Sequence, residues 1–307
     1  MVEILLATYN GEKYLRKQLD SLLAQDYRNF KITIRDDGST DGTREIIDMY
    51  LESSPEKVSL LETKTEYKSV RNNFSELLRN ATGDYIAFCD QDDIWDKQKL
   101  TKEMNTMVRV ESAAGGRMPV LIHSDLSVVD EMLNPIAPSY MAYANIKPEK
   151  FTLKRSLAES CMKSCTVIIN APMLALCKYV PDNAISLDWW LTINAAAFCK
   201  IGYVKEQLVK YRQHGGNFSG AKPGSSLAML KNSKEIRNMK FETQKSYYQA
   251  QEFMDKNPKG LTPEKLAIVK KYAELVNKNG FMRAIGVLFG GYSKKGLVKT
   301  IAQLINA

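Results

Sequence analysis

The sequence predicts an α/β protein built on a mainly parallel β-sheet with helices on both faces. Short apolar runs alternate with segments of helical periodicity from residue 2 to residue 110, and clustered acids directly follow two of these runs. Alternation of this kind is typical of parallel sheets. Because ligands of open α/β sheets bind at the carboxyl ends of the strands, the acids mark a candidate site there.

The first part of the chain supplies four strands and four helices. The strands are short apolar runs, and the helices carry apolar residues at spacings of three and four. We expect strands at Val2–Ala7, Phe30–Ile34, Val58–Leu61 and Tyr85–Cys89, and helices at Glu12–Leu23, from Asp41 onward, at Val70–Asn80 and at Lys97–Val110.

The second part is less regular. We expect strands at Val120–His123, Thr166–Asn170 and Gly202–Tyr211, and helices at Ala171–Tyr179 and Leu187–Phe198. The segment Leu126–Lys163 contains three prolines and is interpreted as loops and short helices that shape a substrate cleft. Beyond the linker candidate Ala221–Ser226 the pattern is helical, at Leu227–Asp255, Pro263–Asn277, Phe281–Leu288 and Leu297–Ile305.

These patterns predict a domain at residues 1–220 followed by a helical extension at 221–307. The extension holds 16 Lys and Arg against 6 Asp and Glu, a formal charge of +10, while residues 1–220 sum to −2. Its apolar residues, flanked by Lys and Arg, suit an interfacial helix on anionic lipid. Packing on the preceding domain or on a second subunit is an equal alternative, and binding to nucleic acid is disfavoured because no such motif is present.

Composition sets further bounds. The chain is 44% apolar and 25% charged, which is ordinary for a globular protein. No apolar run reaches the roughly 18 residues that a membrane span needs, and we expect no signal peptide. The five cysteines form no CxxC pair and only two histidines are present, so we expect reduced thiols in the cytoplasm rather than a zinc site.

The stretch Asp90-Gln91-Asp92-Asp93 places three acids within four residues after a buried strand. Such acids repel each other unless a cation or hydrogen-bond donors offset their charge. A hard divalent ion bound by oxygen ligands would do so, and Mg²⁺ typically takes one or two carboxylates together with substrate phosphates. A solvated acidic turn before the next helix is the simpler explanation of an isolated pattern of this length.

A second acid cluster, Asp36-Asp37-Gly38-Ser39, follows the strand at Phe30–Ile34. A carboxylate there can accept from a base N–H or from ribose hydroxyls, and Gly38 allows a sharp turn. Capping of the next helix accounts for Asp41 but not for the two acids before the turn. The phosphate-binding motifs GxGxxG and GxxxxGK[ST] are absent from the chain.

The motifs occur in a recognisable order: Thr8-Tyr9-Asn10, Asp36-Asp37-Gly38-Ser39, Asn73-Phe74, Gly83-Asp84 and Asp90-Gln91-Asp92-Asp93. Over roughly residues 1–220 the chain resembles family 2 glycosyltransferases of the GT-A fold, and within them the bacterial rhamnosyltransferase-like group. The resemblance divides the domain into a nucleotide-sugar half, about 1–110, and an acceptor half, about 111–220. It implies inverting transfer from a nucleotide-sugar with Mn²⁺ or Mg²⁺.

The resemblance also assigns roles to residues. Tyr9 would pack near the base, Asp37 would bind the pyrimidine edge, and Asp90 would face the ribose or the metal. Asp92 would bind the metal that bridges the diphosphate. The remaining residues expected in the nucleotide-sugar site are Thr8, Asn10, Asp36 and Asn73.

The segment Tyr211-Arg212-Gln213-His214-Gly215-Gly216-Asn217 resembles the family's YRQHG-x-N segment, which closes over the diphosphate. The resemblance implies that His214 completes the metal site and that Arg212 pairs with phosphate. An imidazole can bind Mn²⁺ or hydrogen-bond to phosphate. A histidine in a surface loop is the competing interpretation of His214.

Asp188 matches the position of the family's general base, which takes the proton of the acceptor hydroxyl. Trp189 and Trp190 follow it, and we expect one to stack on an acceptor sugar and the other to be buried. The simpler alternative is a helix cap followed by two core residues. Lys163-Ser164-Cys165 stands where the family often has a glycine-bearing T-G-C segment, so no acceptor contact is carried over from there.

The resulting hypothesis is an enzyme that transfers L-rhamnose from dTDP-β-L-rhamnose to a hydroxyl of a lipid-linked saccharide in cell-wall polysaccharide or O-antigen synthesis. Transfer from a UDP-hexose is the alternative within the class. A non-catalytic nucleotide-sugar-binding protein, recruited to a membrane by its basic tail, is the alternative outside it. We expect a cytoplasmic protein with peripheral contact to the inner face of the cell membrane, and self-association is left open.

Overall fold

The computed structural model of the chain describes residues 1–63, 68–115, 118–148, 151–217, 220–221, 233–257, 260–294, 296, 300–301 and 303–304. Its contacts divide the chain into two compact units. The first consists of Met1–Tyr140, Lys163–Val180 and Cys199–Ala221, and the second of Met141–Met162, Pro181–Phe198 and Lys222–Ala307. The division does not follow chain order, because two internal segments belong with the C-terminal helices.

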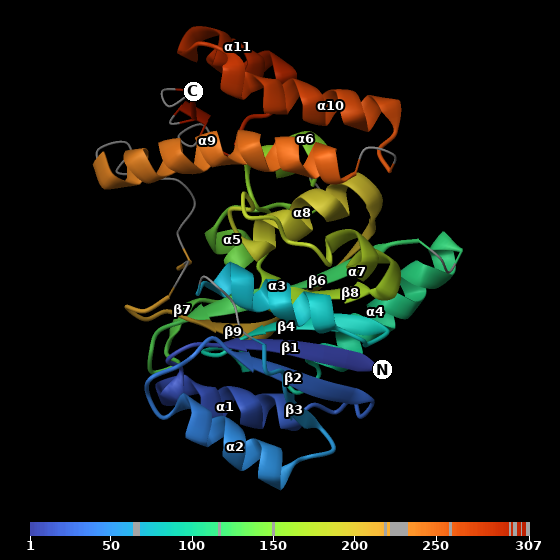
Figure 1. The fold of residues 1–307 in the computed structure, drawn as a ribbon, viewed down its shortest axis with the longest axis vertical. Coiled ribbons are helices and arrows are strands. Elements are labelled where there is room, and N and C mark those ends of the chain that lie inside the picture. The colour runs from blue at the N-terminus through green and yellow to red at the C-terminus, as the bar shows by residue number, and fades with distance from the viewer. Residues whose placement is uncertain are drawn as a thin grey trace. The chain divides into compact units, whose positions relative to one another are not determined.

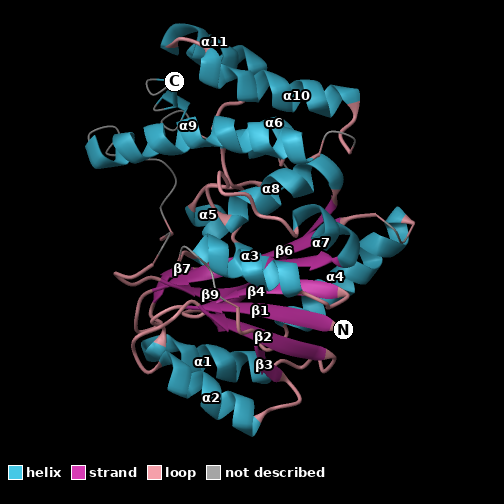
Figure 2. Ribbon diagram, viewed as in Figure 1, coloured by secondary structure: helices cyan, strands magenta, loops and turns pink. Residues whose placement is uncertain are grey.

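The first unit is built on one nine-stranded sheet, seen in Figure 2 as a layer of magenta strands with helices on its faces. The strand order is β3-β2-β1-β4-β8-β6-β9-β5, and β7 pairs with β6. The strands are β1 Val2–Thr8, β2 Phe30–Asp36, β3 Val58–Leu60, β4 Tyr85–Asp90, β5 Ile94–Trp95, β6 Val120–Val129, β7 Pro135–Ala137, β8 Val167–Asn170 and β9 Lys200–Arg212.

Strand pairing brings the two acid clusters to one edge of this sheet. The strand β1 is parallel to both β2 and β4. Thr8 is in register with Asp36, and Ala7 is in register with Asp90. Figure 1 shows these three strands side by side. The predicted α/β fold with a mainly parallel sheet is therefore confirmed, and β8 is an antiparallel insertion between β4 and β6.

Helices cover the sheet of the first unit because each carries an apolar stripe that the strands bury. The helix α3 packs on β1 and β2, while α4 packs on β6 and β9. Side-chain caps begin α3 at Ser69 and α7 at Asn170. The helices of this unit are α1 Glu12–Leu23, α2 Thr43–Ser53, α3 Val70–Asn80, α4 Lys99–Ala114 and α7 Ala171–Cys177.

The segment after His123 is a strand, where the sequence predicts loops. β6 runs on to Val129 because Val128 and Val129 pair with the end of β9. Asp125 interrupts the apolar run, which is why the strand was predicted to end early. Its carboxylate is buried and accepts hydrogen bonds from Ser139 Oγ and from Gln207 Nε2 at 3.1 Å. A buried polar group is tolerated in a strand once such bonds are made.

The second unit is helical and has an aromatic core. Tyr247 and Tyr272 pack with ring centroids 5.0 Å apart, and Tyr292 lies 4.8 Å from Tyr272. No helix among the described residues is long and apolar enough to cross a bilayer. The helices are α5 Tyr140–Tyr143, α6 Leu153–Ala158, α8 Leu187–Phe198, α9 Ser233–Lys256, α10 Pro263–Ala273 and α11 Gly280–Gly290. The predicted linker beyond Ala221 and most of the predicted helix Leu297–Ile305 lie outside the described residues.

Candidate functional site

The end of β2 carries a buried ion pair. Arg35 Nη1 donates to Asp37 Oδ1 and to Asn73 Oδ1, at 3.0 Å in each case. The Asn73 amide donates in turn to the carbonyl of Thr8 at 3.0 Å, and the backbone N–H of Ser69 donates to Asp37 Oδ2 at 3.0 Å. The structure therefore brings three predicted site residues, Thr8, Asp37 and Asn73, into one network. Arg35, which sequence reasoning did not single out, holds the network together.

Asp36 stabilises the turn that follows β2. Its carboxylate accepts from Thr8 Oγ1 at 2.8 Å and from the backbone N–H groups of Ser39 and Gly38 at 2.8 and 3.1 Å. Gly38 has a φ of 78°, which lies in the left-handed region that favours glycine. The Asp36 carboxylate is thus already engaged by the protein, although the residue is only half-buried.

Gln91 ties the Thr8-Tyr9-Asn10 loop to the acid loop. Its amide accepts from the backbone N–H of Tyr9 at 2.8 Å and donates to the carbonyl of Tyr9 at 2.9 Å. A Cβ at Gly11 would lie 2.3 Å from Gln91 Oε1, so only glycine at position 11 allows this approach. Tyr9 keeps its ring exposed, with Lys68 Nζ 5.7 Å from the ring centroid. An exposed ring fits the predicted packing near a base.

Asn10 secures the other side of the same loop. Its backbone N–H donates to Ser39 Oγ at 2.8 Å, and its side-chain oxygen accepts from the N–H of Thr40 at 2.8 Å. Its φ of 47° is one that asparagine tolerates better than most residues. Asn10 therefore joins the loop after β1 to the turn after β2.

Asp92 and His214 are in direct contact although 122 positions separate them. Asp92 Oδ2 lies 2.8 Å from His214 Nε2, and both side chains are largely buried. Asn217 Nδ2 lies 3.4 Å from the same oxygen and donates to the Arg212 carbonyl at 2.9 Å. The two residues predicted from the resemblance as metal ligands thus meet in this structure. The His214 ring also packs on Tyr14, with the centroids 4.6 Å apart.

Arg212 has a different position from the one predicted. The side chain is buried and lies over the Tyr14 ring, so it does not present its guanidinium to a phosphate. Nε donates to the carbonyl of Asp92 and Nη1 to that of Glu131, both at 2.7 Å. Two carbonyls and an aromatic face replace water around part of the guanidinium, while Nη2 has no hydrogen-bond partner among the described residues. The guanidinium braces the acid loop instead.

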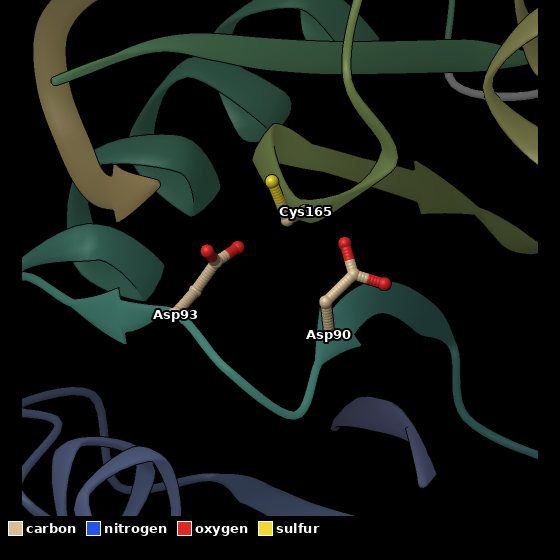
Figure 3. A group of neighbouring side chains, drawn as sticks. All are labelled: Asp90, Asp93 and Cys165. Atoms are coloured by element: carbon tan, nitrogen blue, oxygen red, sulfur yellow. The ribbon is translucent and has the colours of Figure 1, made fainter. Parts of the chain in front are cut away.

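Asp90 and Asp93 lie close to Cys165, with one potential ligand atom of each residue within 4.8 Å of the others. Figure 3 shows both carboxylates pointing toward the segment that carries Cys165. Asp93 is fully buried, and burial together with the charges of Asp92 and Asp90 raises its pKa well above the ordinary range. Its Oδ1 accepts from the Arg212 N–H at 3.1 Å, while Oδ2 has no hydrogen-bond partner among the described residues.

These residues fit a divalent metal. Asp92 Oδ2 and His214 Nε2 share a hydrogen bond of 2.8 Å, and two neighbouring ligands on one octahedral ion with bonds of about 2.1 Å would lie about 3.0 Å apart, so a small movement would let both bind one ion. Sulfur is a poor ligand for hard cations, so Cys165 fits a structural thiol better than a ligand of Mg²⁺ or Mn²⁺.

The residues predicted for the acceptor side belong to the second unit. Asp188 lies in the first turn of α8 and is half-buried. Trp189 and Trp190 are only 4% and 1% exposed. Trp189 Nε1 donates to the carbonyl of Ser156 at 2.7 Å, and Trp190 packs against Phe253 with the centroids 5.7 Å apart. Neither ring offers a face to a sugar, so the predicted stacking role is corrected to one in the core.

The site combines two acid-bearing strand ends on a mainly parallel sheet, a buried network behind one of them and an Asp–His contact at the other, which agrees with the resemblance to nucleotide-sugar transferases of the GT-A fold. The model of Glycosyl transferase family 2 matches residues 3–154. The chain belongs to this family.

Curated relatives extend the similarity. The dTDP-rhamnosyl transferase RfbG of Shigella flexneri is 26% identical over 227 residues, covering 70% of this chain and 74% of that protein. A UDP-Glc:α-D-GlcNAc-diphosphoundecaprenol β-1,3-glucosyltransferase of Escherichia coli, WfgD, is 27% identical and covers 72% and 81%. An uncharacterised protein of Mycobacterium tuberculosis is 27% identical over 69% of this chain, which spans only 59% of that relative's length.

Solved structures share the fold. S. aureus TarS (residues 1–349) in complex with UDP-GlcNAc superposes with a TM-score of 0.55 at 19% identity, covering 99% of this chain and 79% of that one. The mannosyltransferase PcManGT of Pyrobaculum calidifontis, in complex with GDP-Man and Mn²⁺, has a TM-score of 0.53 at 16% identity and covers 94% and 72%. These similarities confirm the predicted fold.

Proposed function

We propose that this protein is a metal-dependent, inverting glycosyltransferase of polysaccharide biosynthesis. The observation that carries the proposal is the contact between Asp92 Oδ2 and His214 Nε2, at the sheet edge that also carries Asp37. Family membership supports the reaction class. Tyr9 would lie against the base and Asp37 would receive the base edge, with Thr8, Asn10, Asp36 and Asn73 fixing the shape of that part of the site. Residues 1–220 would be the catalytic domain.

Asp92 and His214 would hold the metal, and Asp90 would lie on its ribose side. When bound, such an ion supplies positive charge against the leaving nucleoside diphosphate. Mixed oxygen and nitrogen ligands favour Mn²⁺ over Mg²⁺, which prefers oxygen alone. The solved structure of the mannosyltransferase PcManGT is a complex with GDP-Man and Mn²⁺, which supports the same choice.

For the donor we propose dTDP-β-L-rhamnose, and for the acceptor a hydroxyl of a lipid-linked saccharide. The donor is supported by the motif order and by the name of RfbG, and the acceptor class by the name of WfgD. A UDP-hexose is the second candidate donor, because TarS was crystallised with UDP-GlcNAc and WfgD is named for UDP-Glc.

Calorimetry distinguishes these donors. Wild-type protein would be titrated with dTDP-rhamnose, UDP-glucose and UDP-GlcNAc in Mn²⁺, in Mg²⁺ and in EDTA. We expect metal-dependent binding that is tightest for dTDP-rhamnose. Preference for a UDP-sugar would replace the donor and keep the class, whereas the absence of binding to every nucleotide-sugar would refute the proposed function.

Asp188 is proposed as the general base, on the sequence resemblance. In an inverting transfer the base takes the acceptor hydroxyl proton while the oxygen bonds to the anomeric carbon and the bond to the diphosphate breaks. Asp188→Asn should keep donor binding and lose transfer by at least about 100-fold. Asp182→Asn, an exposed acid shortly before α8, is the matched control. Normal turnover in Asp188→Asn would show that Asp188 is not the general base.

A further inference from the structure

The helix α11 exposes its apolar face. Phe281 is 75% exposed and Phe289 is 87% exposed, and Met282 and Leu288 are each close to half exposed. With the half-buried Ile285 they recur at spacings of three and four, which places them along one side of the helix. The buried residue of α11 is Val287, on the opposite side. A surface helix of a globular protein ordinarily has the reverse arrangement.

The helix is well defined as a local structure, so this exposure is not the result of a frayed end. Asn279 caps its first turn, where the side chain accepts from the N–H of Met282 at 2.9 Å. Gly291, with a φ of 76°, ends it in a left-handed cap. α11 packs against α10 and the turn Glu274–Asn277 through its buried side. The apolar face is thus held in a fixed orientation within its own unit.

A basic groove adjoins the apolar face. It has a volume of about 560 Å³, and Phe289 contributes to its wall. Three lysines, Lys154, Lys271 and Lys278, line it together with two glutamates, Glu264 and Glu274. Aromatic and aliphatic side chains beside ammonium groups fit a boundary between acyl chains and anionic headgroups. The charge of the C-terminal region has the sign that such a surface attracts.

We infer that α11 and this groove are a docking surface for anionic phospholipid. Phe281, Met282, Ile285, Leu288 and Phe289 enter the acyl boundary, and Lys154, Lys271 and Lys278 meet headgroup phosphates. A second copy of the chain is a less suitable partner. An 11-residue helix is about 16 Å long, so its face offers a few hundred Å², well below the roughly 800 Å² per partner of a stable interface.

Vesicle sedimentation tests the surface with the full chain and no substrate. Phosphatidylcholine vesicles, with and without phosphatidylglycerol, would be mixed with wild type, Phe281→Ser/Phe289→Ser and the control Met49→Ser/Phe241→Ser, whose two residues are 50% and 58% exposed and lie on α2 and α9. We expect wild type and control to bind the anionic vesicles and the α11 variant to bind at least about tenfold more weakly. Equal binding by all three, or no binding by wild type, would overturn the inference.

The charged half of the surface has its own test. Lys271→Gln/Lys278→Gln should remove most of the preference for phosphatidylglycerol, because each lysine near an anionic surface contributes to binding. Lys17→Gln/Lys97→Gln, with two exposed lysines of the first unit, is the matched control. An unchanged preference in the first variant would contradict the assignment of the groove.

A spectroscopic test does not depend on loss of binding. The three native tryptophans are all at least 96% buried, so Phe289→Trp adds an exposed reporter. When the protein binds anionic vesicles, the emission of this tryptophan should shift to the blue and be quenched by brominated phospholipid. Concentration-dependent self-association that Phe281→Ser/Phe289→Ser abolishes, without vesicle binding, would identify a second copy as the occupant and refute the lipid surface. None of these measurements depends on the proposed transferase activity.

Discussion

The two acid clusters of the sheet edge differ in how their charge is satisfied. Behind β2, Asp37 meets Arg35 and the Ser69 N–H, and Asp36 accepts from Thr8, Gly38 and Ser39. Behind β4, Asp92 contacts His214 and Asn217, and Asp93 accepts from the Arg212 N–H through Oδ1, while its Oδ2 has no hydrogen-bond partner among the described residues. The first cluster is complete in that each of its carboxylate oxygens already has a donor from the protein. The other is incomplete, because one buried carboxylate oxygen in it has no hydrogen-bond partner among the described residues, and we propose that an ion binds here.

The largest expected effect is on folding, at the complete cluster. Asp37→Ala leaves the buried Arg35 guanidinium without its carboxylate, which should cost about 3–5 kcal/mol of the free energy of unfolding. Asp48→Ala is the control, because Asp48 pairs with Arg44 at the surface with both side chains about half exposed, and it should cost about 0.5 kcal/mol. Urea unfolding measures both. Similar losses in the two variants would show that the buried network is not special.

His123, which belongs to neither cluster, should make the free energy of unfolding depend on pH. Burial lowers the pKa of His123, which packs against Tyr203 on the same sheet, to about 4. The unfolded state then binds the proton more readily, so stability is complete above about pH 6.5 and falls as the pH drops toward 4, by roughly 3 kcal/mol in total. His123→Gln should abolish this decline when unfolding is followed between pH 7 and 5. Parallel declines in variant and wild type would refute it.

A substitution in the incomplete cluster should lower activity more than it lowers the free energy of unfolding. Asp92→Asn keeps the size of the side chain but removes the charge opposite His214, so we expect a loss of transfer of at least about 100-fold with little change in the unfolding midpoint. Glu52→Gln, an exposed acid on α2, controls for the loss of a charge. Titration with Mn²⁺ should show weaker metal binding in Asp92→Asn alone. Full activity in Asp92→Asn would show that other residues bind the metal.

The smallest effect should come from substituting Gln91, which links the acid loop to the loop after β1. Gln91→Ala removes two hydrogen bonds to the backbone of Tyr9, each of which contributes about 1 kcal/mol. We expect the dissociation constant for UDP or dTDP to increase severalfold. Gln91→Met, which keeps the length of the side chain, should behave in the same way. If Gln91→Met retained wild-type affinity, packing rather than hydrogen bonding would hold the loop.

The periodic elements of the fold could be predicted from the sequence because local pattern and final burial agree there. The helices Glu12–Leu23 and Val70–Asn80 have the predicted bounds. The prediction failed where partners distant in sequence decide the outcome. β6 continues past Asp125 only because β9 pairs with it and Gln207 bonds to the carboxylate. Neither contact can be recognised from the residues next to it in the sequence.

The candidate site shows the same limit. The acids could be found because charge directly after a buried strand is conspicuous, and the resemblance named Asp92 together with His214. Sequence reasoning missed the bracing groups Arg35 and Gln91, since an arginine at a strand end and a glutamine among acids carry no pattern of their own. It also misplaced Arg212, because burial of a guanidinium depends on the carbonyls of Asp92 and Glu131, which only the fold brings near.

The close approach of Gln91 to Gly11 couples two positions that are 80 residues apart. Any side chain at position 11 would displace the Gln91 amide, so a descendant sequence that loses this glycine would also lose the reason to keep the glutamine. The two residues should therefore be inherited as a pair. A library randomised at both positions and selected for function would recover Gly11 wherever it recovers Gln91, while other pairings would mark loops held together by different means.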